Sequence, residues 1–256
     1  MRNRSLDLLK MISMLLVIGL HFLYYGGFLE QYNTIKTNVL GYCFTWILEA
    51  LCYFSVDVFI LITGYFMCES QMKTTRLFSL AKQVWVYSII GLLIGIIVKC
   101  AFPDIDVQIS KLSLLHTFTP IISGDYWFIT SYFLLMLCVP FLNGVINNID
   151  IDRFQKILFA GIIIFSIVPS FLPWCDTNIF NNGGASPVWF CILYLSGAYI
   201  RKSGIKVKTS FLSSALIVII TIIFSSKLII QICCSEILHK SVGGAYFITI
   251  IAFLCI

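Results

Sequence analysis

The chain has 256 residues, of which 59% are hydrophobic and only 11% charged, and its mean hydropathy is +0.97. Soluble domains carry about 25% charged residues, so this composition excludes a single soluble core and predicts an all-α, polytopic transmembrane bundle. The net charge of +5 is modest, and no run of Lys and Arg interleaves with aromatic residues. Nucleic acid is therefore not expected as a partner, whereas the lipid bilayer is.

The hydrophobic runs predict about seven or eight spans. They lie near 6–28, 41–67, 83–102, 126–147, 154–173, 187–201 and 209–225, with a shorter run from about 242. The first run follows basic residues, as a signal peptide does, but it has no small-x-small cleavage site and reaches Phe28. We expect it to remain as an uncleaved span, and residues 1–256 to form a single integral-membrane domain.

The basic residues predict the orientation of these spans. With the N-terminus in the cytoplasm, 12 of the 17 basic residues fall on the cytoplasmic side, as the positive-inside rule requires. These residues are Arg2, Arg4, Lys10, Lys73, Arg76, Lys82, Arg153, Lys156, Arg201, Lys202, Lys206 and Lys208. The expected location is therefore the cell membrane, with several passes and a cytoplasmic N-terminus.

The first span contains three ionisable residues, Asp7, Lys10 and His21. Lys10 and His21 are eleven residues apart, which at about 100° per residue places them on one helix face, about 16 Å apart along the axis, with Asp7 on the same stripe. An ionisable side chain at membrane depth is a functional candidate, and an imidazole takes and returns a proton near neutral pH. The alternatives are a His21 that only bonds a neighbouring helix and a Lys10 that snorkels to the surface instead of binding an anionic group.

Three cations follow the second span, in a predicted cytoplasmic loop that carries Lys73, Arg76 and Lys82. They could hold phosphate groups, although ordinary positive-inside topology also explains them. Inside the span, Glu49 and Asp57 are carboxylates that either line a polar pathway or pair with a basic residue.

The fourth span begins with the aromatic residues Tyr126, Trp127 and Phe128. They could stack on a sugar ring, but a membrane-interface aromatic belt is expected at this position anyway. The histidines lie far apart and the ten cysteines include no Cys-x-x-Cys, so we expect no metal site.

Several stretches match, in order, the pattern of one family of membrane enzymes. They are the opening with Lys10 and His21, the block Phe59–Phe66, the blocks Asp125–Phe128 and Pro140–Asn143, and the stretch from Gly183 to Arg201. In this respect the chain resembles the acyltransferase-3 family, which O-acetylates bacterial surface polysaccharides. Thr63 stands where that family usually has serine, and Lys73-x-x-Arg76 stands where it has Arg-x-x-Arg.

The resemblance implies transfer of an acyl group, usually acetyl from acetyl-CoA, to a sugar hydroxyl of a surface or lipid-linked polysaccharide. It would make the enzyme an O-acyltransferase of polysaccharide biosynthesis, with acetyl-CoA and the glycan as substrate partners and no bound cofactor. His21 would be the catalytic base and Lys10 its basic partner, with Asp7 beside them. The donor-binding residues would be Lys73, Arg76 and Lys82, and the acceptor or structural motif would comprise Tyr65, Tyr126, Trp127 and Asn143.

Two other interpretations stay open at this point. The family usually has about ten spans, whereas this sequence stops at Ile256 inside an apolar run, which suggests a truncated chain and raises the possibility of an inactive remnant. The alternative from another class is a proton-coupled transporter or flippase of a glycan or small solute. In that protein Asp7, Lys10, His21 and Asp57 would line a proton path.

Overall fold

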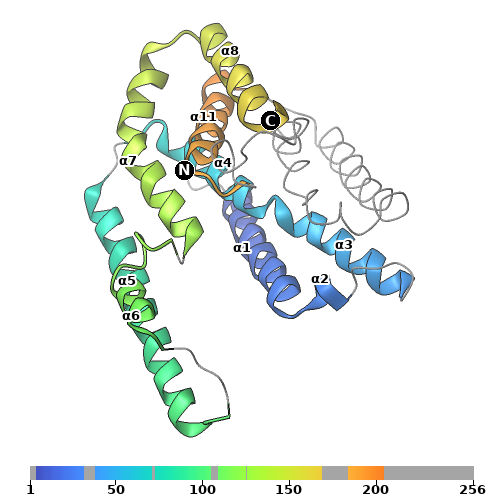
Figure 1. Ribbon diagram of the computed structural model, residues 1–256. Helices are drawn as coiled ribbons and strands as arrows, with labels where there is room; N and C mark the ends of the chain where they lie inside the picture. The colour runs from blue at the N-terminus through green and yellow to red at the C-terminus, as the bar shows by residue number, and fades with distance from the viewer. Residues whose placement is uncertain are drawn as a thin grey trace. The chain divides into compact units, whose positions relative to one another are not determined.

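The computed structural model describes residues 4–31, 38–70, 73–104, 109–124, 126–168 and 184–204. This part of the chain is helical and contains no strand, which confirms the all-α class (Figure 1). Its elements are α1 (Arg4–Tyr25), α2 (Phe28–Gln31), α3 (Val39–Tyr53), α4 (Ser55–Met67), α5 (Thr74–Ala101), α6 (Lys111–Phe118), α7 (Trp127–Asn148), α8 (Ile151–Ile162), the π-helical segment Ile163–Ile167 and α11 (Pro187–Ser203).

Within the described ranges, four helical stretches are long and apolar enough to cross a membrane. They are Leu6–Tyr25, Val39–Met67, Thr74–Ala101 and Trp127–Asn148, and they correspond to the first four predicted spans. At the predicted fifth span lie α8 and the π-helical segment Ile163–Ile167 that follows it directly, and at the predicted sixth span lies α11. The predicted spans at 209–225 and from 242 lie outside the described residues.

The chain divides into two compact units. Unit 1 comprises residues Met1–Glu69 and Leu142–Ile256, and unit 2 comprises Ser70–Phe141. Unit 1 therefore holds the whole of α1 to α4, α8 and α11, together with the last turns of α7. Unit 2 holds α5, α6 and the first part of α7.

The contact between α4 and α11 is the centre of unit 1. The two helices run parallel, because Asp57 bonds to Trp189 at one end and Glu69 bonds to Arg201 at the other, each pair 132 residues apart in sequence. Two glycines allow the backbones to approach. A Cβ atom on Gly197 would lie 2.0 Å from the Leu61 carbonyl oxygen, and one on Gly64 would lie 2.1 Å from that of Tyr194. Small residues at such crossings favour helix association in membranes.

Local sequence explains where α11 begins and ends. The Ser186 hydroxyl accepts a 3.0 Å hydrogen bond from the Trp189 amide, and Pro187 occupies the first turn, where its missing N–H is not needed. Arg201 and Lys202 lie in the last turn, where cations are favoured by the helix dipole. Gly204 then adopts φ +62, the left-handed conformation that ends the helix.

The second predicted span is two helices instead of one. α3 ends at Tyr53 and α4 begins at Ser55, with Phe54 between them. The Ser55 hydroxyl donates a 2.6 Å hydrogen bond to the Cys52 carbonyl, which satisfies an acceptor at the end of α3. In α1, a Cβ atom on Gly19 would lie 3.2 Å from the Cys52 sulfur, so the break faces α1 close to the level of His21.

Two other helix pairs of unit 1 are antiparallel. α1 runs antiparallel to α3 and α4, and α8 runs antiparallel to α11. The pairs that define these directions are Lys10–Phe66, Gly19–Cys52, Phe154–Tyr199 and Gly161–Ile192. Many large apolar side chains of α1 point outwards and are exposed, as expected for a helix that faces lipid.

In unit 2, α6 and the turn after it pack back along the first turns of α5. Lys82 and Trp85 of α5, together with Phe118–Ile122, line a hollow of about 480 Å³. The Thr130 hydroxyl of α7 donates a 2.7 Å hydrogen bond to the Ile121 carbonyl and so holds this turn. The described part of the connection between α5 and α7 contains α6, which is capped by Ser110.

Candidate functional site

His21 lies on α1 with its imidazole exposed, and its own helix orients the ring. Its Nδ1 atom is 3.0 Å from the Val17 carbonyl oxygen, and its ring centroid is 5.9 Å from that of Tyr25. A carbonyl only accepts, so this contact requires the hydrogen on Nδ1 and leaves the lone pair of the neutral imidazole on Nε2. The result is the tautomer that a general base needs, with the accepting nitrogen directed away from the helix backbone.

Lys10 lies on the same unbroken helix, eleven residues before His21, as the spacing predicted. Its Nζ atom is 5.1 Å from the centroid of the Phe66 ring of α4, a cation–π contact. The Lys10 side chain is half-buried, and Asp7, one turn earlier, is half-buried as well. The aromatic end of the Phe59–Phe66 block therefore sets the position of the Lys10 ammonium group.

Asp57 is a buried carboxylate whose Oδ1 atom accepts a 3.2 Å hydrogen bond from the indole Nε1 of Trp189. The sequence suggested that Asp57 either lines a polar pathway or pairs with a basic residue. Its hydrogen-bond donor is instead the neutral indole of Trp189. A buried polar group without a partner is costly, so this bond favours the close pairing of the first turns of α4 and α11. Glu49 of α3 is buried as well.

We expect Trp189→Phe to lower the free energy of unfolding by about 1–3 kcal/mol, because it removes the donor to a buried acceptor. Asp57→Asn should cost less, since the amide oxygen still accepts the indole hydrogen and the acidic group is gone. The measurement is reversible unfolding of the purified protein in mild detergent, with Trp85→Phe at an exposed position of α5 as the matched control. An Asp57→Asn variant less stable than Trp189→Phe would contradict this assignment.

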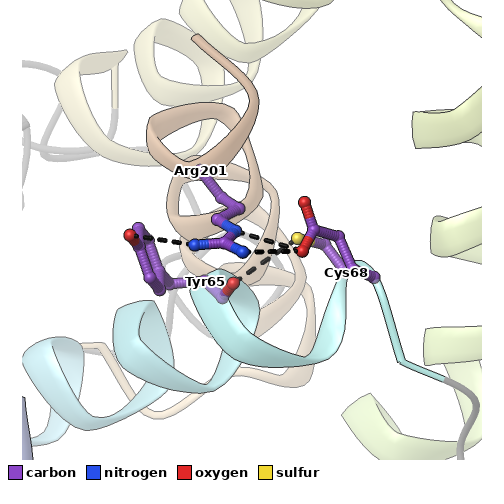
Figure 2. A network of polar contacts seen from close by, with 4 residues as sticks. Tyr65, Cys68 and Arg201 are labelled. Carbon is purple, nitrogen blue, oxygen red and sulfur yellow. Dashed lines mark hydrogen bonds and ion pairs between the residues drawn. The ribbon is translucent and has the colours of Figure 1, made fainter. Parts of the chain in front are cut away.

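A polar network joins the end of α4 to the end of α11, as Figure 2 shows. Arg201 donates from Nε and Nη2 to the same Glu69 oxygen, Oε2, at 3.1 and 2.9 Å, and from Nη1 to the Tyr65 hydroxyl at 3.3 Å. The guanidinium also lies 5.2 Å from the centroid of the Tyr65 ring. The Cys68 thiol donates to the Tyr65 carbonyl at 3.5 Å.

Because the hydrogen bonds from Arg201 favour the charged carboxylate, the pKa of Glu69 is lowered. The ion pair therefore persists above the ordinary pKa of glutamate and is lost as the pH falls through the lowered one.

Asn143 has a structural role at the same end of unit 1. Its Nδ2 donates to the Met67 carbonyl at 3.0 Å, and its Oδ1 accepts a 2.7 Å hydrogen bond from the Tyr194 hydroxyl. The Lys202 ammonium group likewise donates a hydrogen bond to a backbone carbonyl, that of Ile146 in the last turns of α7. These bonds satisfy carbonyls at two helix ends, which have no partner within their own helices. Unit 1 thus brings Tyr65, Asn143 and the Lys10 contact to one end, while His21 lies farther along α1.

The predicted donor-binding residues lie on a helix and not in a loop. Lys73 is the N-cap of α5, Arg76 is in its first turn and Lys82 follows further along. The prediction of a loop was wrong because α5 extends about two turns before its apolar run begins. Two cations, Lys73 and Arg76, therefore lie at the positive end of the helix dipole, and the first turn of α5 contains no acidic residue.

Tyr126 and Trp127 lie at the beginning of α7 in unit 2, where both are partly exposed. The rings of Trp127 and Phe128 meet edge to face with centroids 6.0 Å apart, and Phe128 stacks with Tyr132 at 5.9 Å. Asp125 lies outside the described residues. An exposed aromatic surface thus begins this helix, as either a sugar platform or an interface belt requires.

The sequence interpretation missed the Arg201–Glu69 pair and the Trp189 partner of Asp57. Arg201 belongs to the Gly183–Arg201 stretch and to the predicted cytoplasmic cations, but sequence spacing alone does not indicate a partner more than a hundred residues away. Within the described ranges, no three residues among His, Cys, Asp and Glu gather closely enough to hold a metal ion.

Comparison with known families supports the resemblance that these motifs carry. The family model described as the acyltransferase domain of type 3 matches residues 3–256. The match includes α1 with His21, the α4–α11 pair and the beginning of α5. No curated protein and no solved structure matches the chain significantly.

Proposed function

This chain belongs to the acyltransferase-3 family of membrane acyltransferases, and from that premise we propose that it transfers an acetyl group from acetyl-CoA to a sugar hydroxyl. The acceptor would be a surface or lipid-linked polysaccharide, which makes the protein a carbohydrate O-acetyltransferase. The observation that carries the proposal is the exposed His21 on α1, with Nδ1 against the Val17 carbonyl and Nε2 left to accept a proton.

The reaction needs one base and one leaving group. His21 Nε2 takes the proton of the sugar hydroxyl while the hydroxyl oxygen attacks the thioester carbon of acetyl-CoA. The carbon–sulfur bond then breaks, and the proton returns from His21 to the thiolate of coenzyme A. The ester product and the free thiol balance the reaction without any further reactant.

We assign the donor phosphates to cations on the cytoplasmic side. Lys73 and Arg76 at the N-terminal end of α5 suit an anion, because the helix dipole adds to their charge, and Lys82 follows further along the helix. Lys10, with Asp7 beside it, would provide a positive charge one membrane leaflet away from His21. The positive-inside bias supports a multi-pass protein of the cell membrane with its N-terminus in the cytoplasm.

The acceptor sugar would enter from the opposite side of the membrane. The exposed rings of Tyr126 and Trp127 offer faces on which a pyranose can stack. Tyr65 and Asn143 act differently, since their hydrogen bonds to Arg201, Met67 and Tyr194 hold helix ends together.

The test is an acetyl-transfer assay in membranes from cells that express the protein and from cells that do not. Membranes receive acetyl-CoA labelled in the acetyl group together with a lipid-linked glycan acceptor. We expect label in an alkali-labile ester on the glycan only where the protein is present. Proton-coupled movement of a glycan or solute without ester formation would contradict the proposal and favour a transporter.

A further inference from the structure

The Arg201–Glu69 ion pair at the end of unit 1 is accessible from outside. The side chains of Arg201 and Glu69 are 42% and 57% exposed, so a soluble group can reach both of them. One edge of the guanidinium, Nε with Nη2, is directed at a single oxygen of the carboxylate (Figure 2). This edge matches the two oxygens of a phosphate better than one oxygen atom, because Arg binds phosphate through parallel hydrogen bonds.

The guanidinium would keep its place if Glu69 moved away. Its Nη1 donates to the Tyr65 hydroxyl and its plane lies near the Tyr65 ring, and both contacts are independent of Glu69. Glu69, in contrast, lies in the turn after α4 and is not held within a helix. The cation is therefore preorganised, and its present anion is the more easily moved partner.

The charges around this pair favour an incoming anion. Lys202 follows Arg201 on α11 and adds a second positive charge near Glu69. A phosphate group brings at least as much negative charge as the carboxylate and more acceptor oxygens. An exposed ion pair contributes little to stability, so the loss of the Glu69 contact costs little.

We propose that Arg201 is a phosphate-binding residue whose binding edge Glu69 occupies when no ligand is present. A phosphate group of the acyl donor displaces the carboxylate and binds to Nε and Nη2, while Tyr65 holds the guanidinium. The assignment of this phosphate to the donor rests on the proposed function; the phosphate site itself does not.

The two halves of the ion pair should affect ligand binding in opposite directions. Inorganic pyrophosphate and coenzyme A serve as probes for the purified protein, with affinity measured by calorimetry. Arg201→Gln should weaken pyrophosphate binding about tenfold, and Arg201→Lys should weaken it less, since lysine keeps the charge but not the two-pronged edge. Glu69→Gln should strengthen binding about 3- to 10-fold, because the competing carboxylate is gone.

A purely structural ion pair predicts a different result. If Glu69 and Arg201 only tie α4 to α11, both substitutions remove the same tie, and pyrophosphate affinity shifts in the same direction in both variants. That outcome overturns the proposal. Glu69→Asp gives a second, milder test. The shorter carboxylate should compete less for Arg201, so this variant should bind pyrophosphate more tightly than the wild type does. Thermal unfolding of each variant verifies that the measured chains are folded.

Further measurements identify the source of the phosphate. If the donor binds here, Glu69→Gln strengthens coenzyme A binding as it does pyrophosphate binding, in nanodiscs of neutral lipid. If anionic lipid in the nanodisc displaces pyrophosphate from wild type but not from Arg201→Lys, the ligand is a lipid headgroup, and the donor assignment is overturned. Opposite shifts with pyrophosphate in a protein that transfers no acetyl group would retain the phosphate site and reject only the proposed function.

Discussion

Replacing His21 by alanine should lower the rate of acetyl transfer by about 10²–10⁴-fold, the usual contribution of a positioned general base. A sugar hydroxyl is a weak nucleophile until its proton is removed, and His21 Nε2 is free of the backbone contact that Nδ1 makes with Val17. The imidazole is exposed, so its removal leaves no cavity in the core, and the stability of the protein should change little.

The measurement is single-turnover transfer of labelled acetyl from coenzyme A at equal amounts of folded protein. His116→Ala in α6 is the matched control, because it makes the same change at the other histidine in the described part of the chain and should leave the rate unaltered. Added imidazole should restore part of the activity of His21→Ala, since no described part of the chain covers the vacated position. A His21→Ala variant with a wild-type rate would exclude the base role.

The helical class and the placement of His21 could both be predicted from the sequence. The apolar runs identified α1, α3–α4, α5 and α7, because a bilayer demands long helices and leaves a strong hydropathy signal. The shared face of Lys10 and His21 followed from helical periodicity, which a single unbroken α1 preserves.

The pairing of α4 with α11 could not be predicted in the same way. Hydropathy reports where a helix faces lipid, but not which helix lies against it. Trp189 and Arg201 find partners 132 residues earlier, and only the fold brings them together. The break at Phe54 was also hidden, since residues on both sides of it are apolar and the capping hydroxyl of Ser55 is common in spans. The beginning of α5 was missed because charged residues extend the helix beyond its apolar part.

The structure assigns to α11 a role that its length did not suggest. This helix contacts the buried carboxylate of Asp57 at one end and Glu69 at the other, and between them it packs its own backbone against α4. Tyr194 also holds Asn143, which in turn satisfies the last carbonyl of α4. The end of α4, and with it the aromatic contact of Lys10, therefore depends on the fit of α11.

That dependence makes Gly197 the position where one added methyl group should have the largest effect on stability. A Cβ atom there would lie 2.0 Å from the Leu61 carbonyl oxygen and 2.9 Å from the Tyr65 amide nitrogen, both of them backbone atoms. Backbone cannot rotate away as a side chain can, so α4 and α11 must separate. We expect Gly197→Ala to lower the free energy of unfolding by about 1–3 kcal/mol or more, and Gly197→Leu to prevent the two helices from pairing.

Gly144→Ala provides the opposite case for comparison. Gly144 lies inside α7 with no atom within 4 Å of the added Cβ, so alanine should stabilise the helix by up to about 1 kcal/mol. Both variants are measured by unfolding in detergent and by the fraction that remains monodisperse after extraction. The same substitution should therefore destabilise at one helical glycine and stabilise at the other, which helix propensity alone cannot produce. If Gly197→Ala is as stable as wild type, the close approach of α4 and α11 is wrong, and so is the parallel register that sets Arg201 against Glu69.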